Sequence, residues 1–187
     1  MALSNVVGFD DAPFARNHRG NVRVIGTVYA RSRLDGVLSG TVRRDGINAT
    51  ATLIHMIENS HYQDHLQAVF LQGIALAGFN IIDLARLHRA LGLPIVVVAR
   101  KRPDLASIRS ALLERVPGGQ RKWALIERLP PMTPAAGVFI QTLGLTLEEA
   151  TTLVERFALH GKLPEPIRTA HLVARGITAG GRHRHRP

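Results

Sequence analysis

A run of five apolar, mostly β-branched residues at 95–99 limits what this chain can fold into. Such a run is typical of a strand that is covered on both faces. A second apolar run lies at 67–71, and between the two the apolar residues from Ile81 to Leu91 follow helical spacing, closed by Gly92 and Pro94. Two buried strands joined through a helix form a βαβ unit with parallel strands. The sequence therefore predicts an α/β fold.

The segments on either side complete the predicted architecture. Apolar and β-branched residues predict three consecutive antiparallel strands before the βαβ unit, and capping residues and helical spacing predict further helices. The expected elements are strands at 5–9, 22–29, 37–42, 123–128 and 137–141, and helices at 48–60, at 103–115, from 146 and at 164–177. This order predicts a ribonuclease H-like, mixed five-stranded sheet flanked by helices, with small C-terminal strand and helix additions, although many α/β folds contain similar mixtures.

Length and composition favour one domain in a reducing compartment. The 187 residues are 45% hydrophobic, which suffices for one core, and we expect a single domain at 1–178 followed by a basic flexible tail at 179–187. The chain has no cysteine, which excludes a disulfide scaffold and a thiolate zinc site. Its apolar runs are too short to span a bilayer, and the N-terminus lacks a secretion signal. We therefore expect a cytoplasmic protein that does not enter membranes.

A strong excess of basic residues points to a polyanionic partner. Lysine and arginine number 24 against 14 acidic residues, a formal net charge of +10. The excess is not confined to the tail, because residues 100–128 hold eight basic and three acidic residues, a net +5. A solvated helix face would explain this segment equally simply. The alternative is a surface for DNA or RNA, where such charge attracts the phosphate backbone.

Asp10 ends the first predicted strand, where metal-dependent nucleases need a carboxylate. Divalent ions held there activate water and stabilise the leaving oxygen of a phosphodiester. Asp11 points to the opposite side if the chain stays extended, so only one of the pair need face the site. An isolated Asp-Asp at a strand end is more often part of a turn. Position alone therefore leaves both interpretations open.

Six ordered motifs resemble the endonuclease dU family and cover nearly the whole chain. They lie at 8–14, 34–38, 45–50, 78–83, 94–104 and 164–171. That family is similar to endonuclease V, a ribonuclease H-like nuclease that cleaves DNA or RNA near deaminated bases with a divalent metal. The resemblance, and not the composition, implies an endonuclease that uses Mg²⁺ or Mn²⁺ in DNA repair.

The resemblance also implies roles for individual residues. Asp10 matches the metal carboxylate of the first strand, Asp45 is a candidate second carboxylate, and Asp11 is a further candidate ligand. Arg100 or Lys101 matches a basic residue that approaches phosphate. The resulting candidates are Asp10, Asp45, Gln72 and Lys101 for catalysis, Asp10, Asp11 and Asp45 for metal, and Arg16, Arg100, Lys101 and Arg102 for nucleic acid.

Two positions depart from the family pattern. Gln72 lies where the strand usually ends in Asp-Gly, and Asn48 lies where relatives commonly have Asp. A carboxamide can ligate magnesium, but it lacks the charge that favours two adjacent cations. These departures favour an alternative, a catalytically degenerate nucleic-acid-binding protein or a subunit of a larger repair or defence assembly.

The remaining polar residues are expected to have local roles. Asp83 is more often a helix cap at this spacing, and His171 on an amphipathic helix is expected to be structural. A third hypothesis for the whole chain is a protein-interaction module that binds no nucleic acid. A homodimer through edge strands is compatible with the sequence, but no residue pattern requires it.

Overall fold

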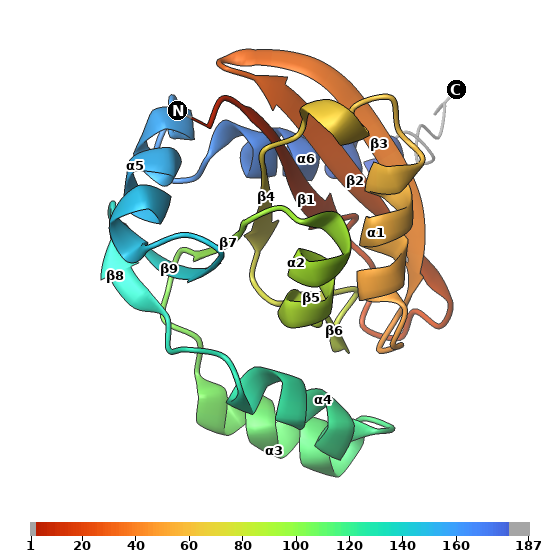
Figure 1. Ribbon diagram of the computed structural model, residues 1–187. Coiled ribbons are helices and arrows are strands. Elements are labelled where there is room, and N and C mark those ends of the chain that lie inside the picture. The colour runs from red at the N-terminus through yellow and green to blue at the C-terminus, as the bar shows by residue number, and fades with distance from the viewer. Residues whose placement is uncertain (1–2, 180–187) are drawn as a thin grey trace, which may run out of the picture.

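A seven-stranded mixed sheet forms the centre of the computed structural model, which describes residues 3–179 (Figure 1). The strand order is β3-β2-β1-β4-β7-β9-β8. The strands are β1 (Asn5–Asp11), β2 (Asn21–Ala30), β3 (Arg33–Arg43), β4 (Ala68–Gln72), β7 (Ile95–Ala99), β8 (Thr133–Ala135) and β9 (Val138–Leu143). The five predicted core strands are thus present, and β9 and β8 extend the same sheet beyond β7.

The pairing pattern confirms the ribonuclease H-like fold. β1, β2 and β3 form an antiparallel meander, while β4 pairs parallel with both β1 and β7. The predicted βαβ unit is therefore confirmed, with α2 (Leu84–Leu91) as its helix. β9 returns antiparallel to β7. Because β1, β4 and β7 run the same way, their C-terminal ends meet at one edge of the sheet.

Helices cover both faces of the sheet. α1 (Ala49–Glu58) and α2 lie on one face, and α5 (Leu147–Phe157) and α6 (Glu165–Ala179) lie on the other (Figure 1). Side chains alternate along each strand, so Phe9 and Leu71 pack with Leu53 of α1, whereas Phe70 packs edge-on against Phe157 of α5 at 5.9 Å between ring centroids. Each face therefore has its own apolar core.

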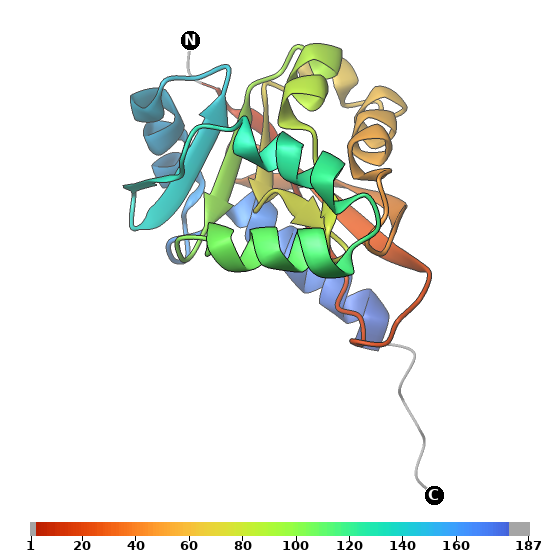
Figure 2. The same ribbon diagram turned by 90° about the horizontal axis from the view of Figure 1, so that it is seen from below.

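Short elements extend beyond the C-terminal ends of the central strands. β5 (Ala75–Leu76) and β6 (Asn80–Ile81) form a small hairpin, and η1 (Gln63–His65) precedes β4. α3 (Leu105–Arg115) and α4 (Gly119–Glu127) form a helical hairpin that lies below the sheet in Figure 1 and in front of it in Figure 2. The prediction of a strand at 123–128 is wrong, because α4 occupies most of it. Its Ile126 packs with Ile81 and Leu112, which gives the apolar run a helical rather than a strand environment.

The capping residues behave as their sequence positions predict. Asp83 caps α2 by accepting from Arg86 N, and Thr146 forms a capping box with Glu149 at the start of α5. No helix within residues 3–179 is long and apolar enough to cross a membrane. The prediction of a flexible tail concerns residues that, apart from Ala179, lie outside the described part of the chain.

Candidate active site

Three residues at the ends of adjacent parallel strands lie on the same face of the sheet. Phe9 pairs with Leu71, and Leu71 with Val97, so Asp10, Gln72 and Val98 come one position later on β1, β4 and β7. This face is the one covered by α5 and α6, because Phe70 and Val98 belong to that core. Strands are spaced by about 4.8 Å, which brings the Asp10 and Gln72 positions close together. Asp10 is 7% exposed.

His171 of α6 contacts Asp10 across the end of β1. Its Nδ1 donates to Asp10 Oδ2 at 2.7 Å. With Nδ1 occupied, Nε2 is left as the acceptor of the neutral ring, and it makes no hydrogen bond within residues 3–179. A carboxylate that fixes the tautomer in this way prepares the imidazole to accept a proton or to bind a metal ion. The expectation that His171 is only structural therefore misses its most distinctive contact.

Gly8 explains how α6 comes to place His171 there. A Cβ at Gly8 would lie 2.5 Å from the carbonyl carbon of Pro166, so only glycine allows this close approach. Thr27 fixes the same point by donating to Pro166 O at 2.6 Å. From Ile167 to His171 the helix advances about 6 Å, and from Gly8 to Asp10 the strand advances about 6.6 Å. The two side chains consequently meet at the edge.

Burial sets the protonation behaviour of Asp10. Loss of water around the carboxylate raises its pKa above the ordinary 3.8, and the hydrogen bond and charge of His171 offset part of this effect. The carboxylate is thus held in a site where negative charge is costly without a cationic partner. A protonated His171 or a bound cation would supply that partner.

Asp11 faces the opposite side of the sheet, as its position after Asp10 predicts. Its Oδ2 accepts from Ala77 N at 2.6 Å in the turn of the β5–β6 hairpin. Burial raises the pKa of Asp11 to about 6, the Ala77 hydrogen bond lowers it in part, and the charge of Asp10 raises it further. Asp11 therefore braces the hairpin, and its carboxyl group remains close enough to that of Asp10 for the two to interact.

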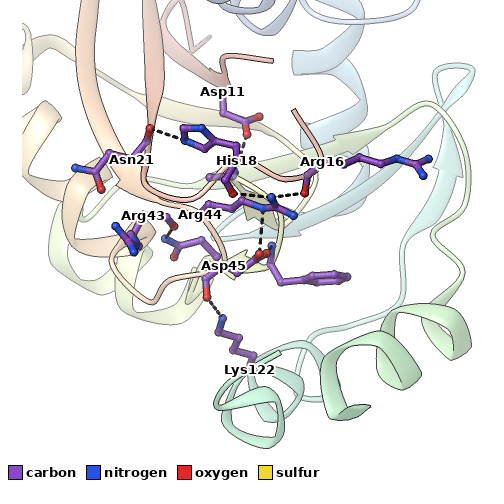
Figure 3. Close-up of polar contacts among 11 residues, drawn as sticks. Asp11, Arg16, His18, Asn21, Arg43, Arg44, Asp45 and Lys122 are labelled. Carbon is purple, nitrogen blue, oxygen red and sulfur yellow. Dashed lines mark hydrogen bonds and ion pairs between the residues drawn. The ribbon is translucent and has the colours of Figure 1, made fainter. Parts of the chain in front are cut away.

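Asp45 is engaged on every side by protein groups (Figure 3). Its Oδ1 accepts from Phe79 N at 2.8 Å, and its Oδ2 lies 3.2 Å from Arg44 Nε. The buried Lys122 donates to its carbonyl oxygen at 2.5 Å. Burial lowers the pKa of Lys122, and the charge of Asp45 raises it in part. Asp45 thus joins α4 and the hairpin to the start of α1.

Asn48 has a comparable bracing role. Its Oδ1 accepts from Arg43 N at 3.0 Å and from Asn80 Nδ2 at 2.8 Å. These contacts fix the loop between β3 and α1. The amide oxygen of Asn48 therefore accepts two hydrogen bonds within the loop. A carboxylate oxygen of an aspartate at this position would accept the same two hydrogen bonds.

Four arginines surround a hollow of about 400 Å³ beside Asp45. They are Arg16 and Arg19 from the loop after β1, and Arg43 and Arg44 from the end of β3. Arg44 is held by the carbonyl oxygens of Arg16 and His18, at 2.5 and 2.7 Å (Figure 3). Its guanidinium lies over the ring of Phe14. The other three are exposed, and their side chains have no hydrogen bond or ion pair within the described residues. Against the one carboxylate of Asp45, the hollow carries a net charge of +3. We call it the arginine pocket.

The cations after β7 form the opposite flank. Arg100 lines a hollow of about 300 Å³ together with Lys162 and Arg168. Arg102 lies over the ring of Phe139, 5.6 Å from its centroid, and Lys101 is exposed. The Asp10–His171 pair thus lies at an edge with basic groups on both flanks.

The sequence-predicted ligands Asp10, Asp11 and Asp45 are divided between two places. Within residues 3–179, no group of three or more His, Cys, Asp or Glu side chains is placed to hold a metal ion. The donors near the strand ends are the Asp10 carboxylate, the neighbouring Asp11 carboxylate and the half-buried Gln72, whose side chain has no partner within the described residues. His171 holds Asp10 through Nδ1, so its Nε2 points away from any ion that Asp10 binds. This set fits one divalent ion completed by water, and it offers no basis for a second ion.

Comparison with known proteins decides the family. A profile of the family described as endonuclease dU matches residues 3–178. The chain belongs to this family. A UPF0215 protein of Deinococcus radiodurans is 57% identical over 178 residues, which are 95% of this chain and 91% of that protein. A crystal structure of a protein of unknown function from Archaeoglobus fulgidus is 33% identical, has a TM-score of 0.87 and covers 93% of this chain and 98% of its own.

Endonuclease V shares the fold at low identity. The Ciona intestinalis enzyme, solved with DNA that contains an inosine followed by a ribo-adenosine, has a TM-score of 0.61 and 12% identity, and the match covers 95% of this chain and 87% of that one. The fold and the family therefore point to a nuclease-like protein that binds nucleic acid.

Proposed function

We propose that this protein is a metal-dependent endonuclease that cleaves DNA or RNA near deaminated bases such as deoxyuridine. The observation that carries the proposal is the contact between Asp10 and His171 at the ends of the parallel strands. It joins residues 161 positions apart in a partly buried polar pair, which a surface edge of a purely structural domain would not require.

The charge of the surroundings supports nucleic acid as the substrate. Arg16 and the other members of the arginine pocket lie on one flank, and Arg100, Lys101 and Arg102 lie on the other. A phosphate backbone laid along the edge would meet cations before and after the Asp10–His171 pair. The Ciona intestinalis endonuclease V shares this fold and was solved in complex with DNA. It is 12% identical to this chain.

A bound Mg²⁺ or Mn²⁺ would polarise the phosphodiester and lower the pKa of its water. Asp10 would hold it, with the Gln72 carboxamide as a neutral second donor, and His171 would orient Asp10 through its Nδ1 hydrogen bond. We propose no metal role for Asp45, because its two side-chain oxygens contact Phe79 N and Arg44. Asp11 uses one oxygen on Ala77 N and interacts with Asp10, so it would add negative charge beside the ion. The role of this chain's residues is then to position one ion and to orient the phosphate with Arg100 and Lys101.

Gln72 favours a second candidate function. A neutral donor at the end of β4 removes a negative charge that the family pattern places there. Weak metal binding would then leave a nucleic-acid-binding protein with little hydrolytic activity, acting alone or as a subunit of a larger assembly. The same basic flanks serve both functions.

One experiment separates the two candidates. The purified protein and its Asp10→Asn and Gln72→Asp variants are incubated with oligonucleotides that contain uracil, inosine or no lesion, in Mg²⁺ and in Mn²⁺. Binding is followed by anisotropy and cleavage by gel. The endonuclease proposal expects wild-type cleavage that Asp10→Asn reduces by at least a hundredfold, with binding reduced far less.

The outcomes are distinct. Salt-sensitive binding without wild-type cleavage, together with cleavage gained by Gln72→Asp, would establish the degenerate binding protein instead. Absence of binding at low salt would contradict both. The double variant Arg86→Ala, Arg89→Ala controls for a general change in surface charge. These exposed arginines lie on α2, away from the strand ends.

A further inference from the structure

The hollow beside Arg100 is lined by basic side chains from three separate segments, and we call it the α6 hollow. Arg100 follows β7, His160 and Lys162 lie in the loop between α5 and α6, and Arg168 belongs to α6. Arg100 and Lys162 are exposed, and neither side chain has a hydrogen bond or ion pair within residues 3–179. The fold thus brings these cations together and leaves two of them without an anionic partner.

A buried glutamate fixes the position of Arg168. Glu165 is 4% exposed, and both of its carboxylate oxygens accept from Arg168 Nε at 2.9 Å. Arg168 Nη2 lies 2.8 Å from Glu165 Oε2, and His160 Nδ1 lies 3.2 Å from Oε1. The guanidinium is therefore held along one edge, and its Nη1 makes no hydrogen bond to the described part of the chain. An arginine fork held in this way is already oriented before a ligand arrives.

The turn between β8 and β9 leaves room for Lys162. Gly137 lies in this turn with φ at +70°, and a Cβ there would lie 3.2 Å from Lys162 Cδ. The stem of Lys162 therefore crosses the turn at a position that carries no side chain. A buried carboxylate and a bare turn thus place two cations of the α6 hollow independently of each other.

The α6 hollow has an excess of positive charge. Arg100, Lys162 and Arg168 carry three positive charges, and Glu165 is the one carboxylate that contacts them within the described residues, which leaves a net charge of +2 with His160 neutral. Like charges gathered in one place repel each other, so an anion bound among them would be stabilised. Arginine and lysine donors of this kind match the oxygens of a phosphate group.

The α6 hollow opens on the same face and edge of the sheet as Asp10. Val138 and Leu163 line it, and both belong to the apolar core on the face covered by α5 and α6. Only β4 lies between β1 and β7, so the ends of these two strands are two strand spacings apart, about 9.6 Å. In B-form DNA each strand carries a phosphate about every 3.4 Å of axis. The distance therefore corresponds to roughly three nucleotides of a stacked strand.

We propose that the α6 hollow binds one phosphate group of the nucleic-acid strand, separate from the phosphate that is cleaved at Asp10. The inference rests on the proposed function, because that function supplies the strand. Arg168, oriented by Glu165, would donate to the phosphate through Nη1, and Arg100 and Lys162 would contribute charge. Arg168 is then a positioning residue, which sets how far along the strand the cleaved bond lies from the bound phosphate.

A scan with neutral linkages tests the proposal. Single-stranded oligonucleotides with one dU carry a methylphosphonate in place of one phosphate at a time, and binding is followed by anisotropy in EDTA so that no cleavage occurs. We expect one position at which the neutral linkage weakens wild-type binding about tenfold, the size of one charge-assisted hydrogen bond. In Arg168→Gln the same linkage should weaken binding by no more than about twofold. Arg89→Gln, on the far side at α2, should keep the wild-type profile.

Lys162→Gln tests the same position without leaving Glu165 unpaired, and it should reduce the effect of the same linkage. Glu165→Gln separates an oriented arginine from a general positive field. The substitution removes a negative charge beside the hollow, so a field alone would tighten binding. The proposal expects weaker binding of the unmodified oligonucleotide, by roughly threefold, because a carboxamide has one acceptor atom where Arg168 uses two. Thermal unfolding checks that each variant remains folded.

The possible outcomes bear on different statements. Equal methylphosphonate profiles in wild type, Arg168→Gln and Lys162→Gln would overturn the phosphate site and leave the proposed function standing. Tighter binding by Glu165→Gln would overturn the role of Glu165 in orienting Arg168. Equal profiles together with competition by inorganic phosphate at constant ionic strength, lost in Arg168→Gln, would assign the hollow to a free anion and overturn its use by the strand. Absence of binding at low salt by every protein would end the proposed function itself.

Discussion

Asp11→Asn should stabilise the protein at neutral and alkaline pH. In the folded state the pKa of Asp11 is raised from 3.8 to about 6, chiefly by burial. Between those pH values the folded state binds more protons than the unfolded state, so the free energy of unfolding falls as the pH rises from about 4 to 6 and is level above. A shift of about two units corresponds to about 3 kcal/mol. Since Asp11 is half-buried and interacts with Asp10, we expect about 1–2 kcal/mol.

The asparagine keeps an oxygen that accepts from Ala77 N but carries no charge. Urea unfolding of both proteins in EDTA, followed by circular dichroism at pH 4 and at pH 8, measures the effect. We expect the variant to be more stable by about 1–2 kcal/mol at pH 8, with little difference at pH 4. A variant that is no more stable at pH 8, or whose advantage is larger at pH 4, would refute the reasoning.

Three further substitutions test the packing that positions the site. Gly8→Ala should cost about 1–3 kcal/mol in urea unfolding, because its Cβ would overlap Pro166; an unchanged midpoint would mean that α6 is not pressed against β1. Phe157→Ala should cost about 3–5 kcal/mol by the same assay, because its ring is 1% exposed. A smaller loss would indicate a loosely packed α5 face. Thr146→Ala should cost about 1 kcal/mol through loss of the capping box, with Thr151→Ala as the control inside the helix.

The core of the fold follows from local sequence patterns. Residues 68–71 and 95–99 are apolar without alternation, and this is sufficient to predict parallel strands covered on both faces. Residues 123–128 show the limit of the method. A short apolar run has no clear period, and only the contacts of Ile126 with the β5–β6 hairpin and α3 make it a helix.

The candidate site was likewise predicted only in part from the sequence. Asp10 was predicted from the family resemblance together with its place at a strand end, because strand order dictates which ends meet. His171 was not, because its contact with Asp10 depends on how α6 docks on β1, and no local pattern records that geometry. The bracing contacts of Asp45 also arise from residues distant in sequence.

The central claim is that Asp10, held in place by His171, forms the metal-binding centre of a nuclease. Calorimetric titration with Mn²⁺ tests it most directly, in wild type, in Asp10→Asn and in His171→Ala, with Asp83→Asn as a control carboxylate that caps α2. The account predicts about one Mn²⁺ per chain in wild type and in the control, and affinity lowered at least tenfold in the other two variants. Equal Mn²⁺ binding by all four proteins would contradict it.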